Sequence, residues 1–150
     1  MMLLTAWLLV GCGPGGARDA TLGPAVEAAV AAAPNGGLVD LVALAPGPWD
    51  EVVVISPGTP ASRIRGDLGF DWPGAADAAS ALENEDVEVL VFLSDGTVTR
   101  WAPVWMQYGA IPYGRWQASP ADGRAGARFT VTRSAADGTV LAPVPSTQGS

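Results

Sequence analysis

The chain carries its clearest β pattern in residues 87–102, VEVLVFLSDGTVTRWA. Residues 87–93 form a run rich in Val, Leu and Phe, and Asp95-Gly96 separates this run from a second β-prone run, 97–102. Asp-Gly is favoured in two-residue hairpin turns because Gly accepts a positive φ. Both faces of residues 87–92 are largely apolar, which predicts a strand in the interior of a sheet.

Shorter patterns on either side of this hairpin predict further strands and helices. The apolar runs 38–45 and 49–56 have the length and β-branched content of strands, and the Pro-Gly-Pro turn between them predicts a second hairpin. A third hairpin is expected from residues 128–133 and 139–144, and one face of its strands should be exposed to solvent. Helices are predicted from Leu22 to Ala33, from a Thr59 N-cap with Pro60 as the first helical residue to Leu68, and near residues 75–82.

Together these elements predict an α+β fold. We expect a single small domain, residues 21–144, with an antiparallel sheet and two or three short helices packed on one face. The length of 150 residues suits one domain, and an apolar content of 49% is enough for a hydrophobic core. Residues 103–126 follow no regular pattern, and residues 145–150 are expected to form a disordered tail.

The charge balance is strongly acidic. The chain holds 15 Asp and Glu against 8 Arg, with neither Lys nor His, and its net charge is −7. Nucleic-acid binding needs a basic surface, so no nucleic-acid partner is expected. The same balance argues against electrostatic docking on anionic lipid.

The residue inventory also narrows the possible chemistry. Without His there is no imidazole base, no Ser-His-Asp triad and no typical zinc site, and without Lys there is no Schiff base. No metal and no cofactor are predicted. Carboxylates, Tyr and Ser remain, so a carboxylate-based hydrolase is the enzyme class that the inventory leaves open.

An apolar run near the N-terminus, residues 2–10, ends in Leu9-Val10-Gly11-Cys12. The run is shorter than the roughly 20 residues that span a bilayer and has the length of a signal-peptide core. Its last four residues resemble the lipobox of bacterial lipoproteins. The resemblance implies that residues 1–11 are a removed signal peptide, that Cys12 is acylated, and that residues 12–20 tether the domain to a membrane.

Export and lipid anchoring would place the domain in the cell envelope, on the outer face of the cell membrane or in the periplasm, depending on the host. No Lys or Arg precedes Cys12, which departs from the usual opening of a signal peptide. The alternative interpretation is a buried N-terminal strand with an incidental Cys. With Cys12 acylated, the chain has no cysteine left for a disulfide or a thiol nucleophile.

An aromatic segment, residues 101–116, offers the main candidate binding site. Aromatic rings and arginines together suit a sugar, a peptide or an apolar ligand, with Arg100 and Arg115 at the edges of the segment to recognise a carboxylate. Alternatively, the rings fill ordinary core space. The candidate binding residues are Trp105, Tyr108, Tyr113, Arg115 and Trp116.

Two weaker candidates lie elsewhere. Residues 49–60 are similar to a strand-turn-helix segment of small secreted bacterial proteins without known activity, and an anion could bind at the helix start near Arg63 and Arg65. The acidic residues 83–86 lack the spacing of a calcium loop and are expected to be a solvated linker. The sequence therefore favours a non-catalytic binding domain on a lipid anchor, with a hydrolase of polysaccharide or cell wall as the alternative.

Overall fold

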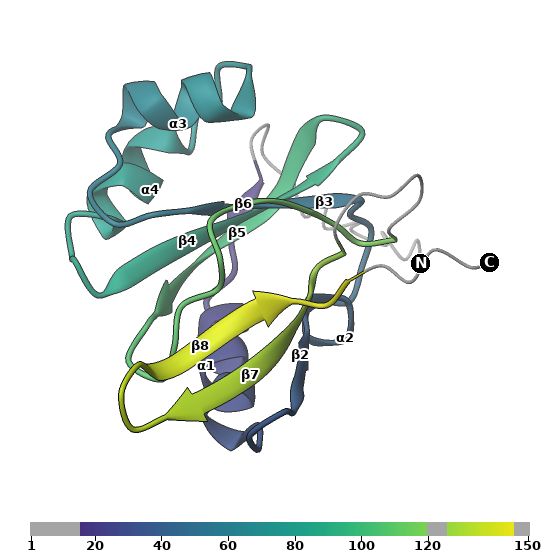
Figure 1. The fold of residues 1–150 in the computed structure, drawn as a ribbon. Helices are drawn as coiled ribbons and strands as arrows, with labels where there is room; N and C mark the ends of the chain where they lie inside the picture. Colours follow the sequence, from purple (N-terminus) through teal and green to yellow (C-terminus); the bar gives the residue numbers. More distant parts are fainter. Residues whose placement is uncertain (1–15, 120–125, 146–150) are drawn as a thin grey trace, which may run out of the picture.

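The computed structural model describes residues 16–119 and 126–145, and the predicted α+β class is confirmed (Figure 1). Cys12, the rest of the signal and lipobox segment, and residues 146–150 lie outside the described residues. The elements, in chain order, are β1 (Ala17–Arg18), α1 (Leu22–Ala32), β2 (Leu38–Asp40), α2 (Leu41–Leu44), β3 (Glu51–Ile55), α3 (Ala61–Leu68), α4 (Ala75–Ala81), β4 (Val87–Ser94), β5 (Thr97–Trp105), β6 (Gly114–Gln117), β7 (Arg128–Ser134) and β8 (Gly138–Pro143).

The larger sheet has five strands in the order β1-β5-β4-β3-β6. The predicted hairpin is confirmed: β4 pairs antiparallel with β5, and Ser94 lies opposite Thr97. The turn residues Asp95 and Gly96 have φ values of 49° and 73°, which is the backbone that favours Asp-Gly in two-residue turns. As expected, β4 is an interior strand, because β3 pairs with its other edge.

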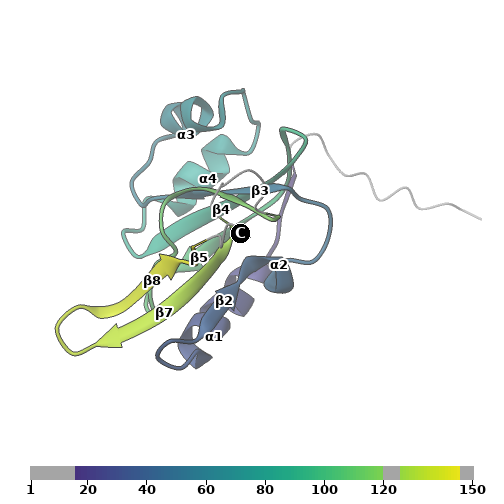
Figure 2. The ribbon, with the colours of Figure 1, turned by 45° about the vertical axis from the view of Figure 1, so that its right-hand side comes forward.

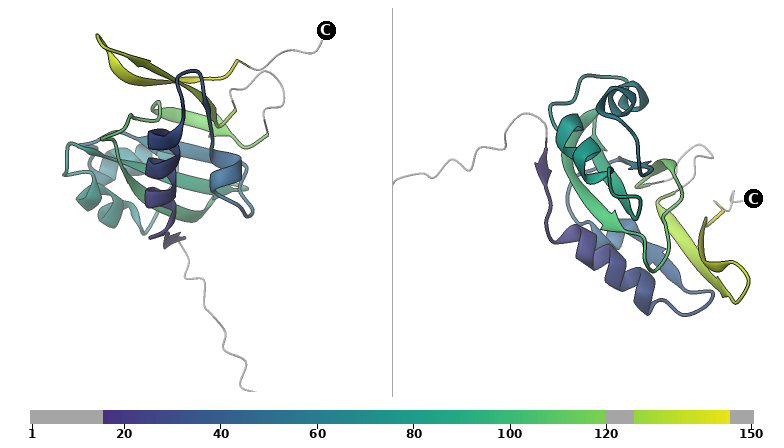
Figure 3. Two further views of the ribbon diagram at one scale, coloured as in Figure 1. Left: turned by 90° about the horizontal axis from the view of Figure 1, so that it is seen from below. Right: turned by 90° about the vertical axis from the view of Figure 1, so that its left-hand side faces the viewer.

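Two hydrophobic cores lie on the two faces of this sheet. Along β4, Val89 and Val91 pack with residues of α3 and α4, whereas Leu90 and Phe92 pack with residues of α1 and the second sheet. Figure 3 shows α1 on one side of the sheet and the α3–α4 pair on the other. The expectation that the helices share one face was therefore wrong, because the alternation along β4 is apolar on both sides and both sides need cover.

A second, three-stranded sheet has the order β2-β7-β8. Its β7–β8 hairpin confirms the predicted pair, with Phe129 and Val131 buried and Thr132 exposed. Figure 2 shows this hairpin reaching beyond the body of the molecule.

The hairpin predicted from residues 38–45 and 49–56 does not form. The first run is β2 followed at once by the short helix α2, because the Asp40 carboxylate accepts a hydrogen bond from the Val42 backbone N–H, 2.9 Å, and caps that helix. β2 then pairs with β7, while β3 lies in the other sheet between β4 and β6.

Three further differences are two strands that the sequence did not predict and one shifted helix start. Ala17–Arg18, expected within the tether, form β1 and pair in parallel with β5, so the folded part begins before residue 21. Residues 114–117, expected to be irregular, form β6 on the free edge of β3. The N-cap of α3 is Pro60 rather than Thr59, whose hydroxyl donates instead to the Ser56 carbonyl, 2.8 Å.

Candidate functional site

The candidate site is the aromatic loop, residues 105–113, which links the end of β5 to the start of β6. Three of its rings are exposed to solvent: Trp105 at 48%, Tyr108 at 44% and Tyr113 at 51%. Soluble proteins usually bury such rings, and exposed Trp and Tyr are enriched at binding hot spots. These three predicted site residues are therefore accessible to a ligand.

The other aromatic residues of the predicted segment belong to the core. Trp101 is buried and packs edge-on against Trp72, with ring centroids 5.9 Å apart. Trp116 is partly buried against Phe129, at 5.2 Å, and its Nε1–H donates to the Pro112 carbonyl, 2.8 Å. The core interpretation thus holds for Trp101 and Trp116, and the surface interpretation holds for the loop.

The aromatic loop is held by contacts along its length. The Met106 N–H donates to the Asp86 carbonyl, 2.9 Å, and the Tyr113 hydroxyl lies 3.6 Å from the Met106 sulfur. Gly109 has a φ of 137° and fits closely against β8, because an added Cβ would lie 2.9 Å from side-chain atoms of Thr139 and Leu141. The loop therefore presents its rings from a backbone with several fixed points.

The two arginines expected to recognise a carboxylate are already engaged. Arg115 forms an ion pair with Glu51 and donates to the Asp67 and Leu68 backbone carbonyls, which ties β6 to the end of α3. The guanidinium N–H groups of Arg115 thus bind groups of the protein itself, and recognition of a ligand carboxylate by Arg115 is not supported.

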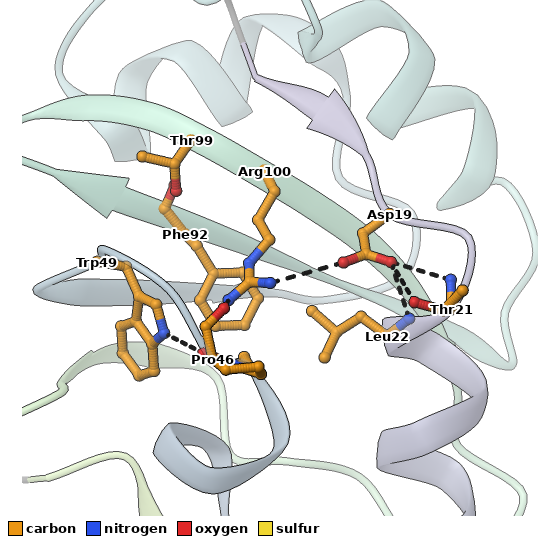
Figure 4. A network of polar contacts seen from close by, with 9 residues as sticks. Asp19, Thr21, Leu22, Pro46, Trp49, Phe92, Thr99 and Arg100 are labelled. Atoms are coloured by element: carbon orange, nitrogen blue, oxygen red, sulfur yellow. Dashed lines mark hydrogen bonds and ion pairs between the residues drawn. The ribbon is translucent and has the colours of Figure 1, made fainter. Parts of the chain in front are cut away.

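Arg100 is engaged in the same way (Figure 4). Its guanidinium lies 3.6 Å from the Asp19 carboxylate, donates to the Pro46 carbonyl at 2.7 Å, and stands over the Phe92 ring at 5.2 Å from the centroid. Arg100 joins the chain before α1 to the loop before β3.

Two of the three exposed rings, Tyr113 and Trp105, border separate hollows. A hollow of about 390 Å³ lies beside Tyr113 and Arg115, at the end of β3 where the shorter β6 leaves part of the strand edge open. A second hollow, of about 270 Å³, lies beside Trp105 between β1 and α1. The predicted residues therefore form a loop surface with a hollow at each end, rather than one platform.

Two carboxylates face the hollow beside Trp105. Asp19 caps the start of α1, accepting from the Thr21 hydroxyl at 2.8 Å and from the Thr21 and Leu22 N–H groups at 2.9 and 3.1 Å. The Thr21 hydroxyl, with these N–H groups and Arg100, lowers the pKa of Asp19 below its usual value. Glu27 accepts from the Trp105 N–H at 2.9 Å. Both groups are hydrogen-bonded to backbone in the structure.

The sequence interpretation missed the most unusual polar residue, Glu88. This residue of β4 is 0% exposed, and one carboxyl oxygen, Oε1, accepts from the Ile111 N–H of the aromatic loop, 3.0 Å. The other oxygen, Oε2, is buried without a hydrogen-bond partner. Burial raises the pKa of Glu88 to about 8, although the Ile111 N–H opposes the shift. A Glu within a run of apolar residues was the available signal.

The weaker sequence candidates gain nothing from the structure. Arg63 and Arg65 form ion pairs with Asp67 and Asp71, at 3.3 and 2.8 Å, so the start of α3 has no free arginine beside it. Within residues 16–119 and 126–145, no cluster of three or more His, Cys, Asp or Glu side chains could hold a metal ion. In the same ranges, none of the helices has the length and apolarity needed to cross a membrane.

Comparison of the chain with protein-family models, with curated proteins and with solved structures gave no match.

Proposed function

We propose that this chain is an exported lipoprotein, anchored through an acylated Cys12, whose folded domain binds an envelope protein or ligand without catalysing a reaction. The anchor rests on the lipobox-like Leu9-Val10-Gly11-Cys12 at the end of an apolar run. A single acyl chain gives only weak membrane binding, so stable anchoring needs more than one chain on the modified residue.

The binding role is carried by one observation, the exposure of three aromatic rings within the nine residues of the aromatic loop. Rings on a fixed backbone lose little conformational freedom on binding, and they offer apolar area together with hydroxyl and indole N–H groups. A partner with a mixed apolar and hydrogen-bonding surface, such as a sugar chain or a protein face, suits this chemistry.

A carboxylate hydrolase is the second candidate, because Asp19 and Glu27 line the same hollow. A hydrolase of this class needs one carboxyl group that gives up a proton near neutral pH. Asp19 has a lowered pKa, and its oxygens accept hydrogen bonds at the start of α1, which favours a structural role. The binding function is therefore the stronger proposal.

The anchor is tested by comparing the wild-type chain with Cys12→Ser after expression in a bacterial host. We expect the wild type in the detergent phase of a Triton X-114 partition and the variant in the aqueous phase. A radiolabelled palmitate precursor should label only the wild type. Partition of the variant into detergent would show that Cys12 is not the anchor.

The binding role is tested with the isolated folded domain and washed envelope material from the native host. Tyr108→Ser and Tyr113→Ser should reduce sedimentation with the envelope, whereas Val140→Ser, a change at an equally exposed apolar residue of β8, should not. Equal sedimentation of all four proteins would contradict a binding role for the loop.

A further inference from the structure

We propose that Glu88 is a proton-controlled latch for the aromatic loop: the protonated carboxyl group holds the loop closed, and loss of the proton favours its opening. The proposal concerns the motion of the loop and does not depend on the lipid anchor or on the identity of a ligand.

The position of Glu88 links the centre of the sheet to the loop. Its side chain lies on the face of β4 that carries Leu90 and Phe92, and its backbone is paired with Val104 of β5. From there Oε1 accepts the N–H of Ile111, which is itself 0% exposed. Ile111 thus fixes the loop to β4 through its backbone N–H and its buried side chain, two residues before the exposed Tyr113.

In the described part of the chain, no ion pair compensates a charge on Glu88. Across the residues that the structure describes, the five ion pairs involve other carboxylates, and none of them includes Glu88. The titratable group that senses Glu88 is the phenol of Tyr113, whose pKa is raised by burial and by the Glu88 charge. The Tyr113 phenol is neutral at physiological pH, so it does not offset a carboxylate.

The closed loop therefore accommodates the protonated Glu88 carboxyl group better than the ionised one. A proton on Oε2 leaves Oε1 free to accept from Ile111 and keeps a neutral group in the core. An ionised carboxyl group in the same place has neither an ion-pair partner nor a donor for its second oxygen among the described residues, which is costly in an apolar interior. Lifting residues 106–112 would admit water to Glu88, and it would break the Ile111–Glu88 hydrogen bond and withdraw the Ile111 side chain from the core.

Linkage gives the expected pH profile of opening. In the open loop Glu88 is hydrated and titrates near its usual pKa of 4.5, whereas in the closed loop its pKa is about 8. The opening equilibrium should then rise about tenfold per pH unit between these two values and level off above the higher one.

The test is amide hydrogen exchange of the folded domain by NMR at pH 5 to 9, with rates corrected for intrinsic exchange. We expect the protection of the Ile111 amide to fall about tenfold per pH unit up to pH 8, while remaining below that of the β4 amides. Glu88→Gln, which stays neutral at every pH, should keep constant protection at Ile111.

Glu27→Gln is the matched control, because Glu27 accepts the Trp105 N–H at the other end of the loop but is only partly buried. This variant should keep the wild-type pH profile. If Glu88→Gln does not fold, the carboxyl ¹³C titration of wild-type Glu88 decides, and it should show a midpoint near 8. Constant protection at Ile111, protection equal to that of β4 at every pH, or a midpoint near the usual value would each overturn the latch.

Discussion

At the scale of single residues, Glu88 carries the largest electrostatic cost in the described part of the fold. A fully buried carboxyl group with one unpartnered oxygen avoids that cost by staying protonated. The sequence places Glu88 in a run whose two faces are largely apolar, which predicts an interior strand but not what covers each side chain. Burial of Glu88 depends on β5 and Ile111 closing over it, and these contacts come from residues 16 and 23 positions away.

The stability of the wild-type domain should depend on pH in the direction opposite to that of most acidic proteins. Because the folded pKa of Glu88 is raised from 4.5 to about 8, the folded state holds one proton more than the unfolded state between these values. Stability is then full below pH 4.5 and falls as pH rises to 8, by up to about 5 kcal/mol. Urea unfolding at pH 5, 6, 7 and 8 measures this slope.

Glu88→Gln isolates the contribution of Glu88. The Gln amide is neutral at every pH, so the fall in the free energy of unfolding between pH 5 and 8 should disappear. Asp19 acts in the other direction: its pKa is lowered, so its contribution is present above the usual pKa of 3.8 and is lost as pH falls further. The wild type should therefore be most stable near pH 5. A stability curve that rises from pH 5 to 8 would contradict the assignment of Glu88 as a neutral buried acid.

At the scale of elements, the turn with a distinctive local sequence was predictable, whereas a cap inside an apolar run and a strand made by a distant partner were not. Asp95-Gly96 sets its own backbone, and the β4–β5 hairpin was predicted from it. The run 38–45 was misassigned because the Asp40 cap starts a helix in the middle of an apolar stretch. β6 was missed because Gly114–Gln117 is a strand through its pairing with β3, not through its own composition.

The hairpin turn provides a direct test at this scale. Gly96 has a φ of 73° and no atom within 4 Å of an added Cβ, so the cost of a substitution comes from the backbone rather than from a clash. Gly96→Val should lower stability by about 1–2 kcal/mol, and Gly96→Asn by clearly less, because Asn tolerates this conformation. Equal losses in urea unfolding would mean that positive φ is not what the turn requires.

The strand β1 gives a second test, since the tether interpretation predicted no structural role for it. Removing residues up to Ala20 from a domain that starts at Gly16 deletes the pairing with β5 and the Asp19 cap of α1. A cap and a short pair of hydrogen-bonded residues contribute about 2 kcal/mol together, so we expect the thermal midpoint to fall by about 5–10 °C. Asp19→Ala should account for about half of the fall. An unchanged midpoint would restore the tether interpretation.

At the scale of the whole molecule, the candidate site was predicted in part. The aromatic content of residues 101–116 was visible in the sequence, but exposure is a property of the assembled fold. Trp116 is covered because Phe129 of the second sheet packs against it, and Arg115 is engaged because α3 ends beside β6. The three rings of the loop are exposed although Ile111 of the same loop is buried, and this division could not be derived from local sequence.

Partial burial predicts that the rings will respond differently to substitution. Trp116→Ala should remove the contact with Phe129 and the hydrogen bond to the Pro112 carbonyl, lowering stability by about 3 kcal/mol. Tyr108→Ala should change stability by less than about 0.5 kcal/mol, because the ring is exposed. Chemical unfolding of both variants measures the difference. A large loss for Tyr108→Ala would mean that this ring supports the fold.

The central claim, that the aromatic loop is the surface through which an anchored domain meets its partner, is tested most directly by photo-crosslinking in the native host. A photoreactive amino acid at Gln107, which is exposed within the loop, leaves all three rings in place, and the same probe at Val140 on β8 is the control. We predict a discrete adduct from position 107 that is lost when Tyr108→Ser and Tyr113→Ser are added, and none from position 140. No adduct from position 107, or equal adducts from both positions, would contradict the claim.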